Sequence, residues 1–328
     1  MKKYFILLGM FLLMLSNSCT QSDYQGLPPA TGGMSELLVV LQNQKWDSNV
    51  GEEIRLLFSS AQNGLNQPEP MYDLMQITHN EFKGMFEKNR KILKIVISDT
   101  VKTDQVLARR DVYAAPQMII EVHAKTDQGV IDLLYSRFPS MVEMYKEVER
   151  ERISDAFAKT ENLKLRQDMI DQFGFYFIMP ESFYNAKEAT QFAWYRLEHS
   201  RYSQCLLVYV REFVDSAQFS PNNIVRYRNK VCMENVPGEL PGSYMSTDTV
   251  FFPDARLVNF AETQAVEMRG LWRTEGDFMG GPFLNYTFLD EKDNQVITLE
   301  GYVYYPNEDK RDLLMQLESI IYSFRYAQ

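Results

Sequence analysis

Short apolar runs alternate with helical stripes in the first half of the chain. Runs typical of buried strands occur at residues 37–41, 71–77, 92–98 and 117–124. Residues 48–58 place apolar side chains on one helical face behind a capping residue, and residues 79–86 favour a short helix. This order of strand, helix and strand predicts an α/β layer.

A longer helical stripe covers residues 126–173, where Pro139 interrupts it and Gly174 suits the position after its end. Its other side is dense in Glu, Lys and Arg. We therefore expect a solvated face with ion pairs between turns, such as those of Lys146 and Arg150. A docking surface is the alternative interpretation.

The second half has mainly the pattern of strands. Residues 266–272 and 284–288 alternate apolar and polar side chains, and residues 290–294 form a hairpin turn before a returning strand at 296–305. A last amphipathic helix covers residues 311–324. This pattern predicts an α+β half, an antiparallel meander with a packing C-terminal helix.

The first residues have the pattern of a lipoprotein leader. Two lysines precede an apolar run at residues 4–15, which is shorter than the ~20 residues of a membrane helix. Ser16 and Ser18 then lead to Cys19, so residues 1–18 are predicted to be a signal peptide. We expect Cys19 to be acylated and to hold the protein on a membrane. Ordinary cleavage beside an incidental cysteine is the alternative.

Three further segments follow the leader. Residues 19–35 are rich in Pro, Gly and polar side chains and predict a flexible tether. Residues 36–173 form the expected N-terminal α/β domain with its helical connector, and residues 174–328 form the C-terminal domain. Because Thr20 rather than Asp follows the cysteine, we expect the outer membrane; its periplasmic and surface faces both stay open.

Charge limits the classes of partner. The chain has 44 acidic and 34 basic residues and a formal net charge of -10. Nucleic acid is therefore not expected as a partner, because phosphate backbones require clustered Lys and Arg. Anionic lipid would also repel the chain, so an acyl anchor has to supply the membrane contact.

Cys205 and Cys232 remain once Cys19 is acylated. In an oxidising compartment two such cysteines either form a disulfide or stay as buried thiols. The sequence leaves both alternatives open.

One family resemblance is carried by the C-terminal stretch and the leader. The motifs are Gly-Leu-Trp at 270–272, Asp-Phe-Met-Gly-Gly-Pro-Phe at 277–283, Glu-Gly-Tyr-Val-Tyr-Tyr-Pro at 300–306 and Lys-Arg-Asp at 310–312. The chain resembles an uncharacterised family of Bacteroidetes-type lipoproteins, the domain of unknown function numbered 4837, over nearly its whole length. The resemblance implies a cell-envelope lipoprotein and brings no activity, cofactor or catalytic residue.

No familiar catalytic or metal motif occurs in the sequence, and we expect no metal, cofactor or catalytic residue. The adjacent residues Glu198, His199 and Ser200 point apart and cannot form a triad by themselves. Asp290, Asp293 and Asn294 lack the spacing of a calcium loop, so a hairpin turn is preferred.

Aromatic residues near the C-terminus are the candidate binding site. The pair Gly280 and Gly281 permits a tight turn or a close backbone approach, and core packing is the alternative role of the aromatic residues beside it. On the last strand, Glu300 and its neighbours two and four positions on alternate with inward residues, so we expect them to be exposed. The candidate binding residues are Trp272, Phe278, Glu300, Tyr302 and Tyr304.

These observations favour a membrane-anchored, non-catalytic binding protein that docks or helps assemble an envelope partner. Glycan binding through exposed aromatic residues is the first alternative. A hydrolase with a non-contiguous site is the second.

Overall fold

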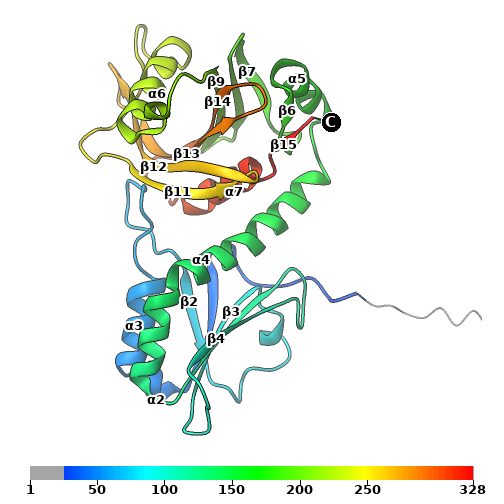
Figure 1. The fold of residues 1–328 in the computed structure, drawn as a ribbon, viewed down its shortest axis with the longest axis vertical. Coiled ribbons are helices and arrows are strands. Elements are labelled where there is room, and N and C mark those ends of the chain that lie inside the picture. Colours follow the sequence, from blue (N-terminus) through cyan, green and yellow to red (C-terminus); the bar gives the residue numbers. More distant parts are fainter. Residues whose placement is uncertain (1–25, 328) are drawn as a thin grey trace, which may run out of the picture.

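The computed structural model describes residues 26–327. The expected signal peptide and Cys19 lie outside the described residues. Two domains follow each other along the chain, and one long helix runs from the first to the second (Figure 1).

The N-terminal domain is built on a five-stranded sheet in the order β2-β1-β3-β5-β4. Its first four strands are parallel, and β4 is antiparallel at the edge. The strands are β1 (Glu36–Val40), β2 (Asp73–Ile77), β3 (Lys91–Ile97), β4 (Gln105–Arg110) and β5 (Met118–Ala124). One face carries an apolar core beneath α2 (Asn43–Trp46), α3 (Asn49–Phe58) and α4 (Asp127–Ala158). The α/β prediction for this half is confirmed.

The helix predicted at residues 79–86 is wrong. The segment forms turns and ends in the 3-10 turn η1 (Phe86–Lys88). Gly84 has a φ of +64°, which an α-helix does not accommodate. Phe82 and Phe86 still pack on the second face of the sheet.

The predicted interruption at Pro139 is also wrong, because α4 continues through it for 32 residues. Thr126 caps the start by accepting a hydrogen bond from the backbone N–H of Gly129. Leu134 and Met141, on either side of the proline, are both fully buried in the core. This packing offsets the missing backbone hydrogen bond.

The C-terminal domain is an antiparallel sheet in the order β10-β12-β13-β14-β9-β8-β7, with β11 paired to β12. Its strands are β7 (Tyr184–Ala189), β8 (Phe192–Glu198), β9 (Ser203–Glu212), β10 (Tyr244–Thr247), β11 (Asp254–Phe260), β12 (Thr263–Glu275), β13 (Gly280–Asp290) and β14 (Gln295–Tyr304). The predicted meander is confirmed by β12, β13 and β14. The turn before β14 is the expected hairpin, in which Asp290 accepts hydrogen bonds from Lys292 and Gln295.

Helices cover both faces of this sheet. The first face packs against α5 (Leu163–Phe173), α7 (Arg311–Tyr322) and the short pair β6 (Phe175–Tyr176) and β15 (Arg325–Tyr326). Gly174 ends α5 with a φ of +76°, as predicted. The second face lies beneath α6 (Pro221–Asn235), which the 3-10 turn η2 (Ser216–Phe219) precedes. The sequence pattern did not reveal α6, although Ser220 followed by Pro221 is a common helix start.

The end of the predicted tether belongs to the N-terminal domain. The backbone of Pro28 and Ala30 exchanges two hydrogen bonds with Ala115, and Thr31 donates to Lys88. The predicted segment 19–35 is therefore too long at its C-terminal end.

Charged side chains on α4 hold the two domains together. Arg150, which is 7% exposed, pairs with Glu318 of α7 at 3.2 Å and with Glu143. Arg269 of β12 pairs with the same Glu318 at 2.5 Å. The prediction of a solvated face is wrong here, because the second domain covers this side of α4.

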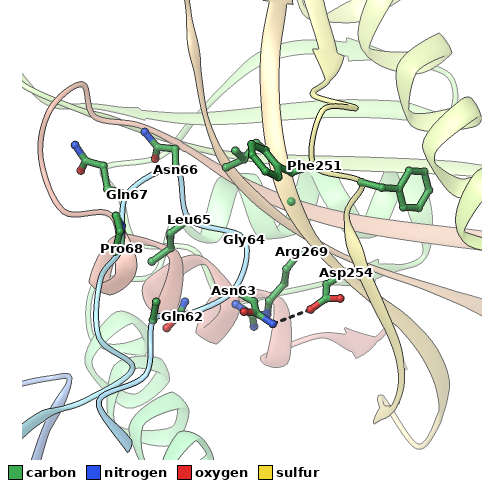
Figure 2. Close-up of a pocket in the computed structure, with 14 residues that line it drawn as sticks. Gln62, Asn63, Gly64, Leu65, Asn66, Gln67, Pro68, Phe251, Asp254 and Arg269 are labelled. Atoms are coloured by element: carbon green, nitrogen blue, oxygen red, sulfur yellow. Dashed lines mark hydrogen bonds between the residues drawn. The ribbon is translucent and has the colours of Figure 1, made fainter. Parts of the chain in front are cut away.

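The loop between α3 and β2 adds further links between the domains. Asn63 donates to Asp254 of β11 at 2.8 Å (Figure 2). The carboxylate of Glu69 accepts the backbone N–H groups of Lys310 and Arg311 at 2.8–3.0 Å. Glu69 thus caps the start of α7 from the other domain, at the end of the helix dipole that favours an anion.

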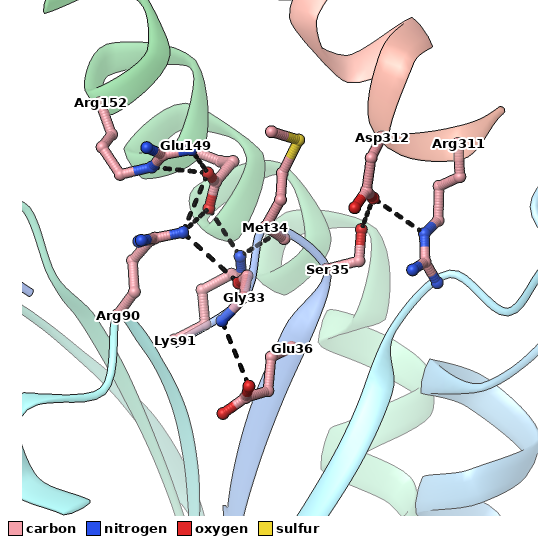
Figure 3. A network of polar contacts seen from close by, with 10 residues as sticks. All are labelled: Gly33, Met34, Ser35, Glu36, Arg90, Lys91, Glu149, Arg152, Arg311 and Asp312. Atoms are coloured by element: carbon pink, nitrogen blue, oxygen red, sulfur yellow. Dashed lines mark hydrogen bonds and ion pairs between the residues drawn. The ribbon is translucent and has the colours of Figure 1, made fainter. Parts of the chain in front are cut away.

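A polar network lies beside this capped end. Glu149 of α4 accepts hydrogen bonds from Arg90 and Lys91 of the N-terminal domain and from Arg152 (Figure 3). Ser35 donates to Asp312 of α7 at 2.5 Å. The domain interface therefore satisfies many buried charges, which favours one fixed arrangement of the two domains.

Candidate aromatic binding pocket

Three of the five candidate binding residues line one pocket of the C-terminal domain. Trp272 from β12 and Tyr302 and Tyr304 from β14 contribute to a cavity of about 210 Å³. Even-numbered side chains of β14 point to the α6 face, as the alternation predicted. Residues 236–239, which follow α6, close one side of the cavity.

The expected exposure of these residues is wrong. Tyr302 and Trp272 are buried at 4% and 2% exposure, and Tyr304 is partly buried. The reason is α6, which covers the face that the sequence pattern leaves open. What remains accessible is a recess rather than a flat aromatic patch.

Glu300 is not part of the pocket. Its side chain is fully buried and accepts three hydrogen bonds from Arg228 of α6 at 2.7–3.0 Å and one from the Tyr209 hydroxyl at 3.2 Å. Arg228 also donates to Thr247 and lies over the ring of Phe283. The expectation of an exposed carboxylate is therefore wrong, and this pair holds α6 on the sheet.

Phe278 also lies outside the pocket, fully exposed in the turn between β12 and β13. The glycines after it serve packing. A Cβ atom on Gly281 would overlap the carbonyl oxygen of Val303, so only glycine fits beside β14. The same carbonyl accepts the indole N–H of Trp272 at 3.2 Å and fixes that ring in the wall.

Most of the other pocket residues were not predicted from the sequence, and two of them carry aromatic or charged groups. Trp194 and Arg196 project from β8, with the guanidinium 4.7 Å from the indole centroid. The aromatic and alternating character of residues 192–198 was a signal for a strand, but its pocket face depends on the position of α6. Arg196 also pairs with Glu198.

These two side chains bring an indole ring and a partly exposed guanidinium to the pocket. Within residues 26–327 the buried Nε1 of Trp194 and Nε of Arg196 have no oxygen or nitrogen partner. The indole N–H lies beside the Cys205 sulfur, which is a weak acceptor. Aromatic walls and a partly exposed guanidinium suit a ligand with an apolar ring face and oxygen acceptors.

Cys205 and Cys232 are free thiols in the apolar cluster beneath α6. Burial raises the pKa of Cys205 to about 11, although Tyr302 and Arg196 act in the opposite direction. Burial likewise raises the pKa of Cys232 to about 12. The disulfide alternative is not realised, and both thiols stay protonated at neutral pH.

The candidate hydrolase residues are not assembled into a relay. His199 lies in the exposed turn after β8 and stacks on Tyr202 at 4.6 Å. Glu198 accepts a hydrogen bond from Ser203 instead. No three His, Cys, Asp or Glu side chains among the described residues are placed to hold a metal. In that part of the chain no helix has the length and apolarity to span a bilayer.

The architecture defines a two-domain α/β and α+β protein with an aromatic pocket in its second domain. Residues 162–323 match the domain of unknown function DUF4837, the family that the sequence motifs indicate, but this match covers the second half of the chain and not nearly its whole length. Residues 30–158 match a second domain of unknown function, DUF8532. No curated protein matches the chain.

Three solved structures show partial similarity. A point mutant of the protein Mog1 is 11% identical, with a TM-score of 0.29, and the match covers 47% of this chain and 92% of that one. The Saccharomyces cerevisiae Ran-binding protein Mog1p is 9% identical, with a TM-score of 0.32 and coverages of 47% and 91%. LpqN of Mycobacterium tuberculosis, which is involved in cell envelope biogenesis, is 10% identical, with a TM-score of 0.28 and coverages of 47% and 83%.

Proposed function

We propose that this chain is a lipid-anchored, non-catalytic binding protein of the cell envelope. Its anchor is Cys19, and its aromatic pocket receives one sugar ring of an envelope glycan. The observation that supports this most strongly is the set of four aromatic residues, Trp194, Trp272, Tyr302 and Tyr304, around one cavity.

The size and chemistry of the pocket support a single ring. Its volume of about 210 Å³ lies below the ~300 Å³ at which pockets for drug-sized ligands begin. The C–H face of a sugar packs on aromatic rings, and its hydroxyl oxygens accept hydrogen bonds from the partly exposed guanidinium of Arg196.

Tryptophan fluorescence provides a direct test. Two of the three tryptophans of the chain line the pocket, so a glycan selected on an array should change the emission on titration. Arg196→Met keeps the apolar part of the side chain but removes the guanidinium donors and should weaken binding about tenfold. Tyr184→Ala, on the exposed edge strand β7, is the control. Equal affinity in Arg196→Met, or an array without any binder, would contradict the proposal.

The anchor is tested separately. Cys19→Ser should move the protein from the membrane fraction to the soluble fraction. A variant that stays in the membrane pellet after a carbonate wash would refute acylation as the means of attachment.

Docking of an envelope protein is the second candidate function. The specific observation in its favour is the connection between β10 and β11, where Val250, Phe251 and Phe252 are 74%, 70% and 50% exposed. Cross-linking in intact cells, followed by mass spectrometry, should recover a discrete partner that Phe251→Ser loses. A partner recovered equally well with the variant would exclude this surface.

A further inference from the structure

A larger cavity, distinct from the aromatic pocket, lies between the two domains. It has a volume of about 480 Å³ and is bounded by the loop at residues 60–63, by α4 and by β11 and β12. A neighbouring recess of about 500 Å³, drawn in Figure 2, shares Asn63, Asp254 and Arg269 with it. Domain interfaces are a common location of ligand sites. We call the cavity of about 480 Å³ the interdomain cavity.

The interdomain cavity has an apolar wall and a charged wall. The apolar side chains are Met71, Phe138, Pro139 and Val142. The charged part is lined by the basic residues Lys146, Arg256 and Arg269 and by the acidic residues Glu143, Asp254 and Glu267. A ligand enclosed here therefore meets apolar surface and charged groups of both signs, and which of these are free to bind it depends on how they are paired.

The carboxylates of this region already have partners. Glu267 accepts two hydrogen bonds from Arg256 at 2.7–3.0 Å and one from Arg269 at 2.5 Å. Glu318 pairs with Arg150 and Arg269, and Glu143 pairs with Arg150. Asp254 accepts from Asn63 across the domain boundary. Each acid is thus bound to a neighbour.

Lys146 is the exception among the charged residues. It is partly buried, and among residues 26–327 no carboxylate lies within ion-pair distance of its ammonium and no hydrogen bond satisfies it. Burial lowers the pKa of Lys146, while the nearby charge of Glu318 opposes that shift. An ammonium in such surroundings gains from any anion that enters the cavity.

Arg256 provides a second positive group at the same cavity. Its Nε and one terminal nitrogen donate to the same oxygen of Glu267. Its side chain is 57% exposed, so the other terminal nitrogen stays available to a ligand.

We propose that the interdomain cavity binds an organic anion with an apolar body. The carboxylate or phosphate of the ligand contacts Lys146 and Arg256, and its body packs against Phe138 and Val142. Because the walls come from both domains, the ligand also bridges them. This site is independent of the aromatic pocket.

A pair of probes of equal shape tests the requirement for charge. Isothermal titration calorimetry with the full chain compares 1-naphthaleneacetate with its neutral analogue 1-naphthaleneacetamide. We expect the acid to bind about tenfold more tightly, the gain typical of one charge-assisted hydrogen bond. Equal affinities for the two probes, or no binding of the acid, would overturn the proposal.

Variants locate the site. Lys146→Met keeps the length and apolar volume of the side chain but removes its charge, and should abolish the preference for the acid. Lys164→Met, at an exposed position of α5, is the matched control. Trp194→Phe should leave the affinity unchanged, because that residue belongs to the other pocket. If Lys146→Met does not fold, Arg256→Gln serves in its place, and an undiminished preference for the acid would overturn the proposal.

Discussion

Two sets of buried charges in this protein differ in how completely they are satisfied. In the C-terminal core, Arg228 and Glu300 are fully buried and bound to each other, to Thr247 and to Tyr209. At the domain interface, Arg150, Arg269 and Glu318 are equally well paired, but Lys146 beside them is not. Charges that are all paired with one another stabilise the fold, whereas a charge without a paired neighbour can still bind a ligand.

The largest loss of stability is expected when Glu300, in the C-terminal core, loses its charge. Glu300→Gln leaves the guanidinium of Arg228 buried without a counter-ion, so we expect a loss of about 3–5 kcal/mol in the free energy of unfolding. Urea denaturation measures it. The control Glu291→Gln, in an exposed turn, should stay within about 0.5 kcal/mol. A similar midpoint for both variants would mean that the pair does not hold α6.

The domain interface should lose less stability than the C-terminal core when one carboxylate is neutralised. Glu318→Gln weakens the ion pairs with Arg150 and Arg269 but leaves both arginines with other carboxylates, Glu143 and Glu267. We expect a loss of about 2–3 kcal/mol in the free energy of unfolding, measured in the same urea titration. Asp168→Asn, which breaks an exposed pair on α5, is the control. A loss as small as that of the control would show that the interface does not depend on these pairs.

Acid should remove the difference in unfolding free energy between the native chain and Glu318→Gln. Burial alone would raise the pKa of Glu318, but Arg269, Lys146 and Arg150 together hold it well below its usual range. A lowered pKa in the folded state contributes stability above the unfolded value of ~4.3, and this stability is lost as pH falls towards the folded pKa. The gap between the native chain and Glu318→Gln should therefore be constant at neutral pH and shrink below about pH 4. A gap that widens in acid would contradict the sign of the shift.

The smallest effect is expected at Lys146. Burial disfavours the ammonium of Lys146, the charge of Glu318 favours it, and no bonded partner lies among the described residues, so Lys146→Met should change the free energy of unfolding by no more than about 1 kcal/mol. Thermal unfolding of the variant without ligand measures this change. A large loss of stability would place Lys146 with the structural charges and remove the contrast with Arg228.

Much of the fold follows from local pattern. The parallel runs of the first domain, the hairpin at residues 290–294 and the last helix all appear where apolar periodicity and turn residues predict them. Gly281 was expected to permit a close backbone approach, and it lies against Val303. Each of these features depends on residues close in the sequence, or on one strand beside the next.

The candidate site was predicted only in part. Alternation along β14 correctly placed Glu300, Tyr302 and Tyr304 on one face. The prediction that this face is exposed was wrong, because α6 covers it. The sequence pattern did not reveal α6, because it has few of the apolar repeats that indicate a helix. Trp194 and Arg196 entered the pocket from a strand whose inner face the sequence does not define.

By itself, the sequence determined the two-part architecture, the resemblance of the second domain to its family and which strand residues share a face. Period-2 alternation and turn chemistry are local properties, so they can be read without the fold. Only the tertiary structure decided which face is covered, which charges are paired and where cavities lie. Those properties depend on contacts between residues far apart in the chain, such as Arg228 with Glu300 and Arg150 with Glu318.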